Sequence, residues 1–256
     1  MTVQIEICIE HVASAMAAQQ GGAHRLELCS NLLQGGLTPS LGFVEQVHEL
    51  VDLDLMVMIR PRPGDFLCSD DEFEVMKRDI AHVGRLGVQG VVFGLLQSDG
   101  QINRKQTAEL IQAARPMQVT VHRAFDFARD PFEALDLLLE LGVERVLTSG
   151  QEKTAVAGLD LLRQLQARAG DALTILPAGG INAQNGKRIL TEAALRELHI
   201  GSGVKEQVFS QMVGRPSGVQ VGGANAPEES SWVQVSVERV RELVTAVADT
   251  DTKVDV

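Results

Sequence analysis

The stretch DPFEALDLLLELGVERVLTSG, residues 130–150, holds one complete helix-to-strand unit. Asp130 and Pro131 supply an N-cap residue and a proline at the first helical position, which predicts a helix over residues 131–141. Gly142 suits the left-handed backbone at which many helices end, and the aliphatic residues after it predict a strand over 144–148. A helix followed this closely by a strand is typical of the βα units of a parallel sheet.

The same order of helix, glycine and strand recurs along the 256-residue chain. Gly22, Gly87 and Gly170 each precede an aliphatic segment, and Ser69 with Glu72 forms a capping-box pattern before an amphipathic helix predicted over 71–86. Strands are predicted at about 3–9, 25–29, 54–60, 88–93, 117–122, 144–148, 173–177 and 196–200. Eight such units in about 250 residues predict an α/β fold, a single-domain (β/α)8 TIM barrel spanning residues 1–256.

The alternative parallel fold, an open doubly wound sheet, favours a glycine-rich dinucleotide turn after its first strand. Residues 8–11, Cys-Ile-Glu-His, contain no such turn. Residues 203–231 break the repeating pattern, because they are rich in Gly, Ser and Pro and precede a last helix predicted over 236–249. A loop of this length is either functional, such as a lid, or disordered.

The formal net charge of −11 argues against nucleic acid as a partner, because phosphate backbones repel an acidic chain. No apolar run approaches the ~18 residues of a transmembrane helix, so no membrane partner is predicted. Residues 1–6 lead directly into a strand pattern without a secretory signal. The three cysteines are therefore expected to be reduced thiols, which indicates a cytoplasmic protein.

Polar residues occupy positions that should face the barrel interior. Side chains alternate along a strand, so one parity packs against helices and the other points inward. The inward parity contains Gln4, Glu6, Cys8, Glu10, Arg25, Glu27, Cys29, Met56, Met58, Arg60, Thr120, His122, Glu197 and His199. A purely structural barrel fills this space with branched apolar residues. Buried carboxylates are costly unless they pair, and Glu6 and Glu27 could pair with Arg60.

This polar interior has two interpretations. In the first, the charged groups form a buried ion network that only sets strand register. In the second, which we favour because the polar positions lie in the later half of several strands, they line a pocket at the carboxyl ends. Arg60 would then hold a carboxylate or phosphate group with its guanidinium fork. Glu6, Glu27 and His122 are candidate catalytic acids or bases, unless His122 is merely hydrogen-bonded.

Two glycine-containing turns follow the last two strands. Gly179 and Gly180 follow the seventh strand, and Gly201 with Ser202 follows the eighth. In many barrels of this type these two loops bind a phosphate through backbone N–H groups, and glycine allows the close approach. The alternative is a pair of tight turns without a ligand. We interpret the two loops, together with Arg60, as an anion-binding site.

All three cysteines fall at the same predicted end of the barrel. Cys8 and Cys29 end adjacent strands, and Cys68 lies in the loop after the third strand. Soft thiolates select Cu(I), so two or three converging thiols would form a copper site. Because no CxxC motif is present, the residues alone favour the alternative, in which Cys8 and Cys29 are small buried apolar side chains.

Several of these residues lie in stretches that resemble the CutC family, which is named for copper homeostasis. The matching stretches are Glu6–Cys8, Leu26–Cys29, Gly35–Gly42, Arg60–Phe66, Thr120–Asp126 and Arg145–Gly150. The resemblance implies a cytoplasmic (β/α)8 barrel that forms a homodimer or larger homo-oligomer. It also implies a link to copper handling through Cu(I), and the matched residues that would bind it are Cys8, Cys29 and Cys68. It implies no organic cofactor and no agreed reaction.

Two functional hypotheses therefore stand side by side. The chain is a copper-homeostasis protein that captures Cu(I) at the barrel mouth, or it is an enzyme that performs lyase- or isomerase-like proton transfer on a small phosphorylated or carboxylated metabolite. A scaffold with a vestigial pocket is a third possibility, against which the polar interior argues. The fold alone does not choose among them.

Overall fold

The computed structural model describes residues 3–212 and 230–248. Its parallel strands are β1 (Gln4–Ile9), β2 (Arg25–Leu28), β3 (Asp54–Met58), β4 (Gly90–Phe93), β5 (Gln118–Val121), β6 (Arg145–Thr148), β7 (Thr174–Pro177) and β8 (Glu197–Ile200). Its α-helices are α1 (Val12–Gly21), α2 (Leu41–Leu50), α3 (Asp70–Gly84), α4 (Arg104–Ala114), α5 (Pro131–Glu140), α6 (Leu159–Ala169), α7 (Gly186–Glu192) and α8 (Val237–Ala248). Every predicted strand coincides with one of these strands, and the helices predicted over 71–86, 131–141 and 236–249 coincide with α3, α5 and α8.

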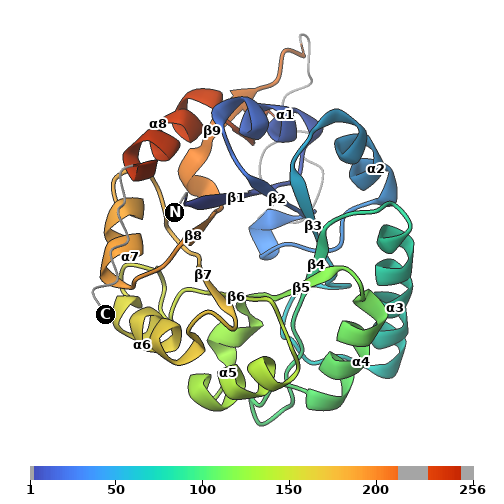
Figure 1. Cartoon of the computed structure of the whole chain (residues 1–256). Coiled ribbons are helices and arrows are strands. Elements are labelled where there is room, and N and C mark those ends of the chain that lie inside the picture. The colour runs from blue at the N-terminus through green and yellow to red at the C-terminus, as the bar shows by residue number, and fades with distance from the viewer. Residues whose placement is uncertain (1–2, 213–229, 249–256) are drawn as a thin grey trace.

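The eight parallel strands are hydrogen-bonded in the order β7-β6-β5-β4-β3-β2-β1-β8. Strands β7 and β8 are also in contact, so the strands form a ring with the helices arranged around it (Figure 1). This arrangement confirms the predicted single-domain (β/α)8 barrel. No helix within the two described ranges is both long and apolar enough to cross a membrane.

Local sequence sets several helix boundaries in the predicted way. The Asp130 carboxylate accepts hydrogen bonds from two backbone N–H groups in the first turn of α5, where Pro131 is the first residue. Ser69 and Glu72 form the two reciprocal bonds of a capping box at the start of α3. Each cap satisfies N–H groups that lack a partner within the helix, which stabilises the helix by typically ~1 kcal/mol.

The strand parity predicted to face the helices is apolar and buried. Ile5, Ile7 and Ile9 of β1 belong to one continuous apolar core, as do Leu26 and Leu28 of β2. This core lies between the ring of strands and the surrounding helices, so the helices cover the outer face of the sheet. The interior of the ring is therefore the place where polar side chains of the other parity gather.

The segment predicted as a loop over 203–231 is partly regular. It starts with the 3-10 helix η3 (Ser202–Val204) and continues into β9 (Lys205–Phe209), which pairs antiparallel with β10 (Ser231–Val235). Residues 213–229 lie outside the described residues. The prediction missed both strands because a long segment joins them, whereas the sequence signals for a hairpin depend on a short turn.

Candidate functional site

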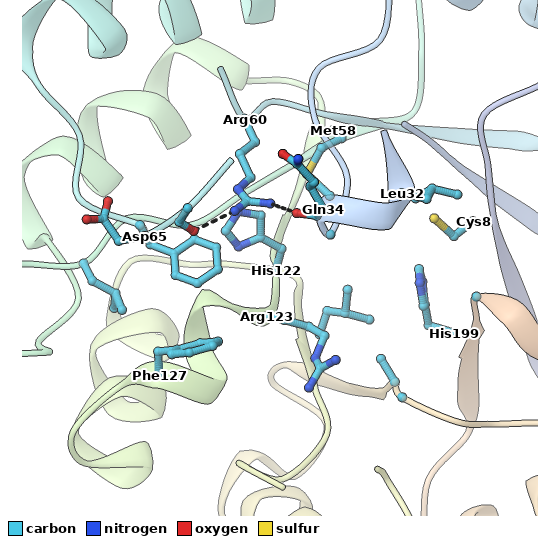
Figure 2. A pocket seen from close by; sticks show the side chains of 18 of the residues that line it. Cys8, Leu32, Gln34, Met58, Arg60, Asp65, His122, Arg123, Phe127 and His199 are labelled. Atoms are coloured by element: carbon cyan, nitrogen blue, oxygen red, sulfur yellow. Dashed lines mark hydrogen bonds between the residues drawn. The ribbon is translucent and has the colours of Figure 1, made fainter. Parts of the chain in front are cut away.

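A cavity of about 890 Å³ opens at the carboxyl ends of the barrel strands (Figure 2). Its walls contain eight residues that were predicted to form a site, namely Cys8, Glu27, Arg60, His122, Gly179, Gly180, Gly201 and Ser202. Apolar side chains, among them Phe66 and Phe127, line the same cavity. Glu6, Cys29 and Cys68 were also predicted to belong to the site but do not line this cavity.

Glu6 belongs to a buried ion cluster inside the ring. One carboxylate oxygen accepts a hydrogen bond from Arg25 Nε, and the other lies 2.6 Å from His199 Nδ1. Burial alone would raise the pKa of Glu6, but Arg25 and His199 lower it to about 2. Arg25 Nη2 also lies 2.5 Å from Glu197 Oε2. Arg145 Nε lies 3.7 Å from the same Glu197 oxygen. An ion network between strands is therefore present, but its arginines are Arg25 and Arg145 and not the predicted Arg60.

Arg60 does not pair with the two carboxylates that were predicted as its partners. Its guanidinium donates to the backbone carbonyls of Gln34, at 2.9 Å, of Gly36, at 3.2 Å, and of Gly64, at 2.9 Å. The residue comes after the end of β3 at Met58, so its side chain lies among the loops of the mouth and not inside the ring.

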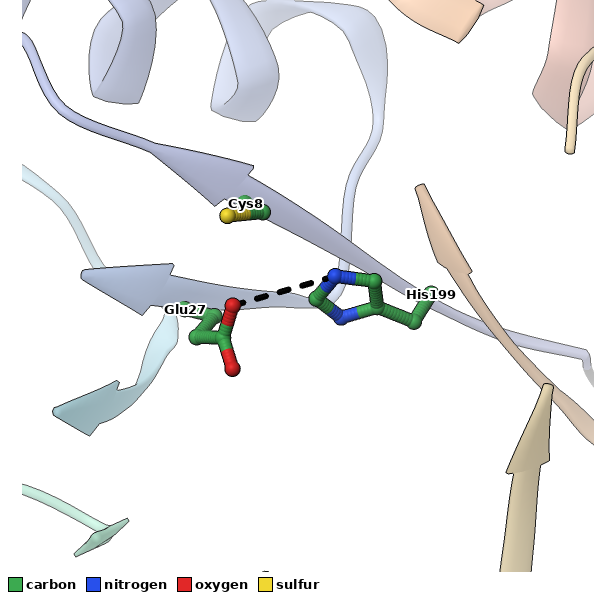
Figure 3. A group of neighbouring side chains, drawn as sticks. All are labelled: Cys8, Glu27 and His199. Carbon is green, nitrogen blue, oxygen red and sulfur yellow. Dashed lines mark ion pairs between the residues drawn. The ribbon is translucent and has the colours of Figure 1, made fainter. Parts of the chain in front are cut away.

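Three buried side chains from adjacent strands meet in the cavity (Figure 3). Cys8 Sγ, one Glu27 carboxylate oxygen and one His199 ring nitrogen all lie within 4.8 Å of one another. Burial and the neighbouring Cys8 raise the pKa of Glu27 well above its usual value. Burial would lower the pKa of His199, but Glu27, Cys8 and Glu6 raise it well above its usual value. The two groups are therefore coupled, because the charge on Glu27 that raises the pKa of His199 is itself opposed by burial and by Cys8.

Cys8 and Cys29 form a pair of buried thiols, with 3.8 Å between their sulfur atoms. The Cys29 thiol also lies 3.5 Å from Glu27 Oε2 and donates to it. The Cys29 side chain and His199 bring the pKa of Cys8 well below its usual value, whereas burial and Cys8 raise the pKa of Cys29. The first proton is thus lost more readily from this pair than the second.

Cys68 lies apart from this thiol pair. Its sulfur contacts the backbone carbonyl of Ser69 at 3.5 Å and Met76 Sδ at 3.8 Å, so it packs beside α3. Burial raises its pKa to about 11. Of the two or three thiols expected to converge, Cys8 and Cys29 do so and Cys68 does not, because the loop after β3 carries Cys68 to a helix while the other two stay inside the ring.

His122 has a fixed hydrogen-bonding role at the mouth. Its Nδ1 accepts a hydrogen bond from the backbone N–H of Ala124 at 3.2 Å. Burial and the charge of Arg60 lower the pKa of His122 to about 3, so the ring is neutral at pH 7. A neutral imidazole that accepts at Nδ1 carries its proton on Nε2, so His122 offers the cavity a hydrogen-bond donor. A pKa this low makes His122 a weak base near neutral pH, and its role as a catalytic acid or base stays a prediction.

The glycine turns lie on the side of the mouth opposite β3. Gly179 and Gly180 have φ values of +99° and +70°, which a side chain would strain. Within the described residues, the N–H groups of Gly179, Gly180 and Gly201 make no hydrogen bond. These free donors are compatible with the predicted anion site, and an anion there stays a prediction.

Comparison with known proteins shows the family to which the chain belongs. The model of the CutC family matches residues 3–204. The chain belongs to the CutC family. It is 45% identical over 239 residues to the copper homeostasis protein cutC homolog of Mus musculus, and the match covers 93% of this chain and 87% of the relative. The Homo sapiens homolog is 44% identical with the same coverage. The solved CutC structure from Streptococcus agalactiae has a TM-score of 0.75 at 28% identity, covering 78% of this chain and 99% of that one.

The stretches by which the sequence resembles the CutC family surround the cavity. Five of the cavity residues, each from a different stretch, show this: Cys8, Glu27, Gly35, Arg60 and His122. The features that mark this chain as a CutC-family member are therefore concentrated at the carboxyl ends of the strands, and not in the outer helices.

Sequence reasoning gave no role to His199, a member of this site, or to Arg25, which lies behind it in the ion cluster. Strand alternation placed Arg25 and His199 in the interior, but neither was assigned a partner. The strand register shows the reason: Glu6 lies opposite Arg25 on β2 and opposite His199 on β8. Alternation reveals which way a side chain points, but only the register reveals which side chains share a level of the ring.

Proposed function

We propose that the thiol pair of Cys8 and Cys29 binds Cu(I) and that the chain takes part in copper homeostasis. One observation carries this proposal: the two sulfur atoms lie 3.8 Å apart on adjacent strands, so both can contact one ion. Soft thiolate ligands select Cu(I) over harder divalent metals. The names of the Mus musculus and Homo sapiens relatives point to the same metal.

The protonation of the cluster supports this assignment. Thiolates and not thiols bind metals, and the low pKa of Cys8 makes it the first ligand. Binding of the ion to Cys8 would draw the proton from Cys29, so Cu(I) uptake should release protons. His199 lies within reach as a third ligand once its Nε2 has lost its proton, whereas the carboxyl oxygen of Glu27 is a hard donor and suits Cu(I) poorly.

Anaerobic titration of the reduced protein with Cu(I), in competition with a chromophoric chelator, tests the proposal. The wild type and Cys68→Ser should both bind one ion with the same affinity, because Cys68 lies outside the pair. Cys8→Ser and Cys29→Ser should each lower the affinity by at least about tenfold. Unchanged Cu(I) affinity in the Cys8→Ser/Cys29→Ser double variant would show that this site is wrong.

The size of the cavity favours a second function. Its volume of about 890 Å³ falls in the range of sites for small organic molecules and far exceeds the needs of an ion. We propose an enzyme that transfers a proton on a small phosphorylated or carboxylated metabolite. Glu27 is the proposed general acid, because burial and Cys8 raise its pKa and its buried Oε1 has no partner in the described residues.

Screening of the copper-free protein against sugar phosphates and organic acids by thermal shift tests this second function. A ligand at ~100 times its dissociation constant stabilises the folded state by ~2.7 kcal/mol, which the melting temperature reports. Turnover of any such ligand should fall in Glu27→Gln and persist in Cys68→Ser. The absence of any shift across both compound classes would exclude this function.

We further propose a cytoplasmic protein that forms a homo-oligomer. All three cysteines are free, as expected in a reducing compartment. Sedimentation equilibrium tests the oligomer, and fractionation of cells that express the chain tests its location. A monomeric mass at micromolar concentration would exclude the oligomer, and recovery outside the cytoplasmic fraction would exclude the location.

A further inference from the structure

The ring of Phe66 holds two polar groups on the β3 side of the cavity. The Arg60 guanidinium carbon lies 5.0 Å from the ring centroid, in a cation–π contact. The imidazole of His122 lies 5.1 Å from the same ring, centroid to centroid. Phe66 therefore fixes a charged donor and a neutral donor beside each other (Figure 2 shows both side chains).

Arg60 is a buried cation without an anionic partner. It is 8% exposed, and its three hydrogen bonds all go to backbone carbonyls. The nearby Asp65 carboxylate is held by Arg62, with Nη2 to Oδ1 at 2.8 Å, and no other carboxylate in the described ranges forms an ion pair with Arg60. A buried charge of this kind is costly unless an opposite charge joins it. The cavity therefore favours an anion at this wall.

The neighbouring surface is aromatic and open. The ring of Phe127 lies 5.3 Å from that of Phe66, and Phe127 is 66% exposed although it lines the cavity. A large apolar side chain with this exposure gains free energy when a ligand covers it. A flat ring placed on Phe127 would bury it and would leave an attached anionic group near Arg60 and His122.

We propose that this wall binds an organic carboxylate that carries a flat ring. The carboxylate would lie at Arg60 and His122, and the ring would pack on Phe127. This assignment names a substrate class for the enzyme proposed above and rests on that function for turnover alone. Binding itself requires neither copper nor the thiol pair.

Calorimetric titration of the copper-free protein with benzoate tests the subsite. Benzyl alcohol has the ring without the charge, and acetate has the charge without the ring, so both should bind at least about tenfold more weakly than benzoate. Added salt should weaken benzoate binding, since the attraction to Arg60 is electrostatic. Equal affinity for benzoate and benzyl alcohol, or no heat from ~10 mM benzoate, would overturn the proposal.

Two exposed phenylalanines provide a matched pair of variants. Phe127→Ala should weaken benzoate binding about 2- to 12-fold, the range expected for loss of one aromatic contact. Phe209 is also 66% exposed but lies on β9, so Phe209→Ala should leave benzoate binding unchanged. Both changes lie at the surface, so neither should prevent folding. Arg60→Gln is a less suitable test, because it also removes three hydrogen bonds that hold the loops. Equal affinities in the two alanine variants would overturn the role of Phe127.

The two proposals can fail separately. Benzoate binding without turnover of any ring-bearing carboxylate would contradict the proposed enzyme but not the proposed subsite. Turnover of a metabolite by protein that does not bind benzoate would contradict the proposed subsite alone.

Discussion

Replacement of Arg25 by methionine should destabilise the fold strongly. Arg25 is 5% exposed and pairs with two carboxylates, Glu6 and Glu197. Methionine fills a similar volume but leaves the carboxylate of Glu6, which is 1% exposed, with His199 as its remaining charged partner. Removal of one partner from a buried pair typically costs 3–5 kcal/mol, and we expect a loss of about 3–5 kcal/mol in the free energy of unfolding.

Urea denaturation followed by circular dichroism measures this loss. Arg104→Met is the matched control, because Arg104 forms an equally short pair with Glu140 on the surface, where both side chains are more than half exposed. That change should cost at most ~1 kcal/mol. Addition of Glu6→Gln to Arg25→Met should recover part of the loss, since the uncompensated charge is then gone. A cost for Arg25→Met no larger than that for Arg104→Met would refute the reasoning.

The stability of the fold should also depend on pH through Glu6. The ionised carboxylate stabilises the fold fully above its unfolded pKa of about 4.5, and this contribution of ~3 kcal/mol is lost as the pH falls through about 2. Urea titrations of Glu6→Gln should therefore show a weaker dependence of the unfolding free energy on pH in this window. Ser69→Ala should lower the free energy of unfolding by ~1 kcal/mol, because the capping box is lost; no change would show that the cap is dispensable. Gly203→Ala should lower the melting temperature, since its Cβ would lie 2.0 Å from the carbonyl oxygen of Ile181, whereas Gly42→Ala meets no atom within 4 Å and should not lower it.

Much of the barrel could be predicted because its signals are local. Asp130 and Pro131 mark the start of α5, and Gly142 follows its end with a left-handed φ of +72°. Such residues act within a few positions of themselves, so a single sequence is enough to read them. The pairing of β9 with β10 could not be predicted, because it depends on two segments that meet only in the folded chain.

The candidate site was predictable in composition but not in its pairings. Strand alternation correctly placed Glu6, Glu27 and His199 inside the ring. The predicted partner of Glu6 was wrong. Arg60 lies two residues beyond the end of β3 and leaves the ring, whereas Arg25 starts β2 and remains within the ring. Cys68 was misplaced for the same reason, since a loop residue has no register with the strands.

The levels of the ring explain how a buried ion network can serve a functional site. Glu6 lies opposite Arg25 and His199, and Cys8 lies opposite Glu27 at the next inward-facing position along β1. Arg25 keeps Glu6 ionised, and ionised Glu6 binds His199 Nδ1, which leaves His199 Nε2 directed to Glu27, 3.7 Å away. The two interpretations of the polar interior are therefore not alternatives. The deeper level is an ion network that orients and charges the imidazole of His199, whose ring reaches Cys8 and Glu27 in the level above. Arg25, which does not line the cavity, acts on this cluster through Glu6.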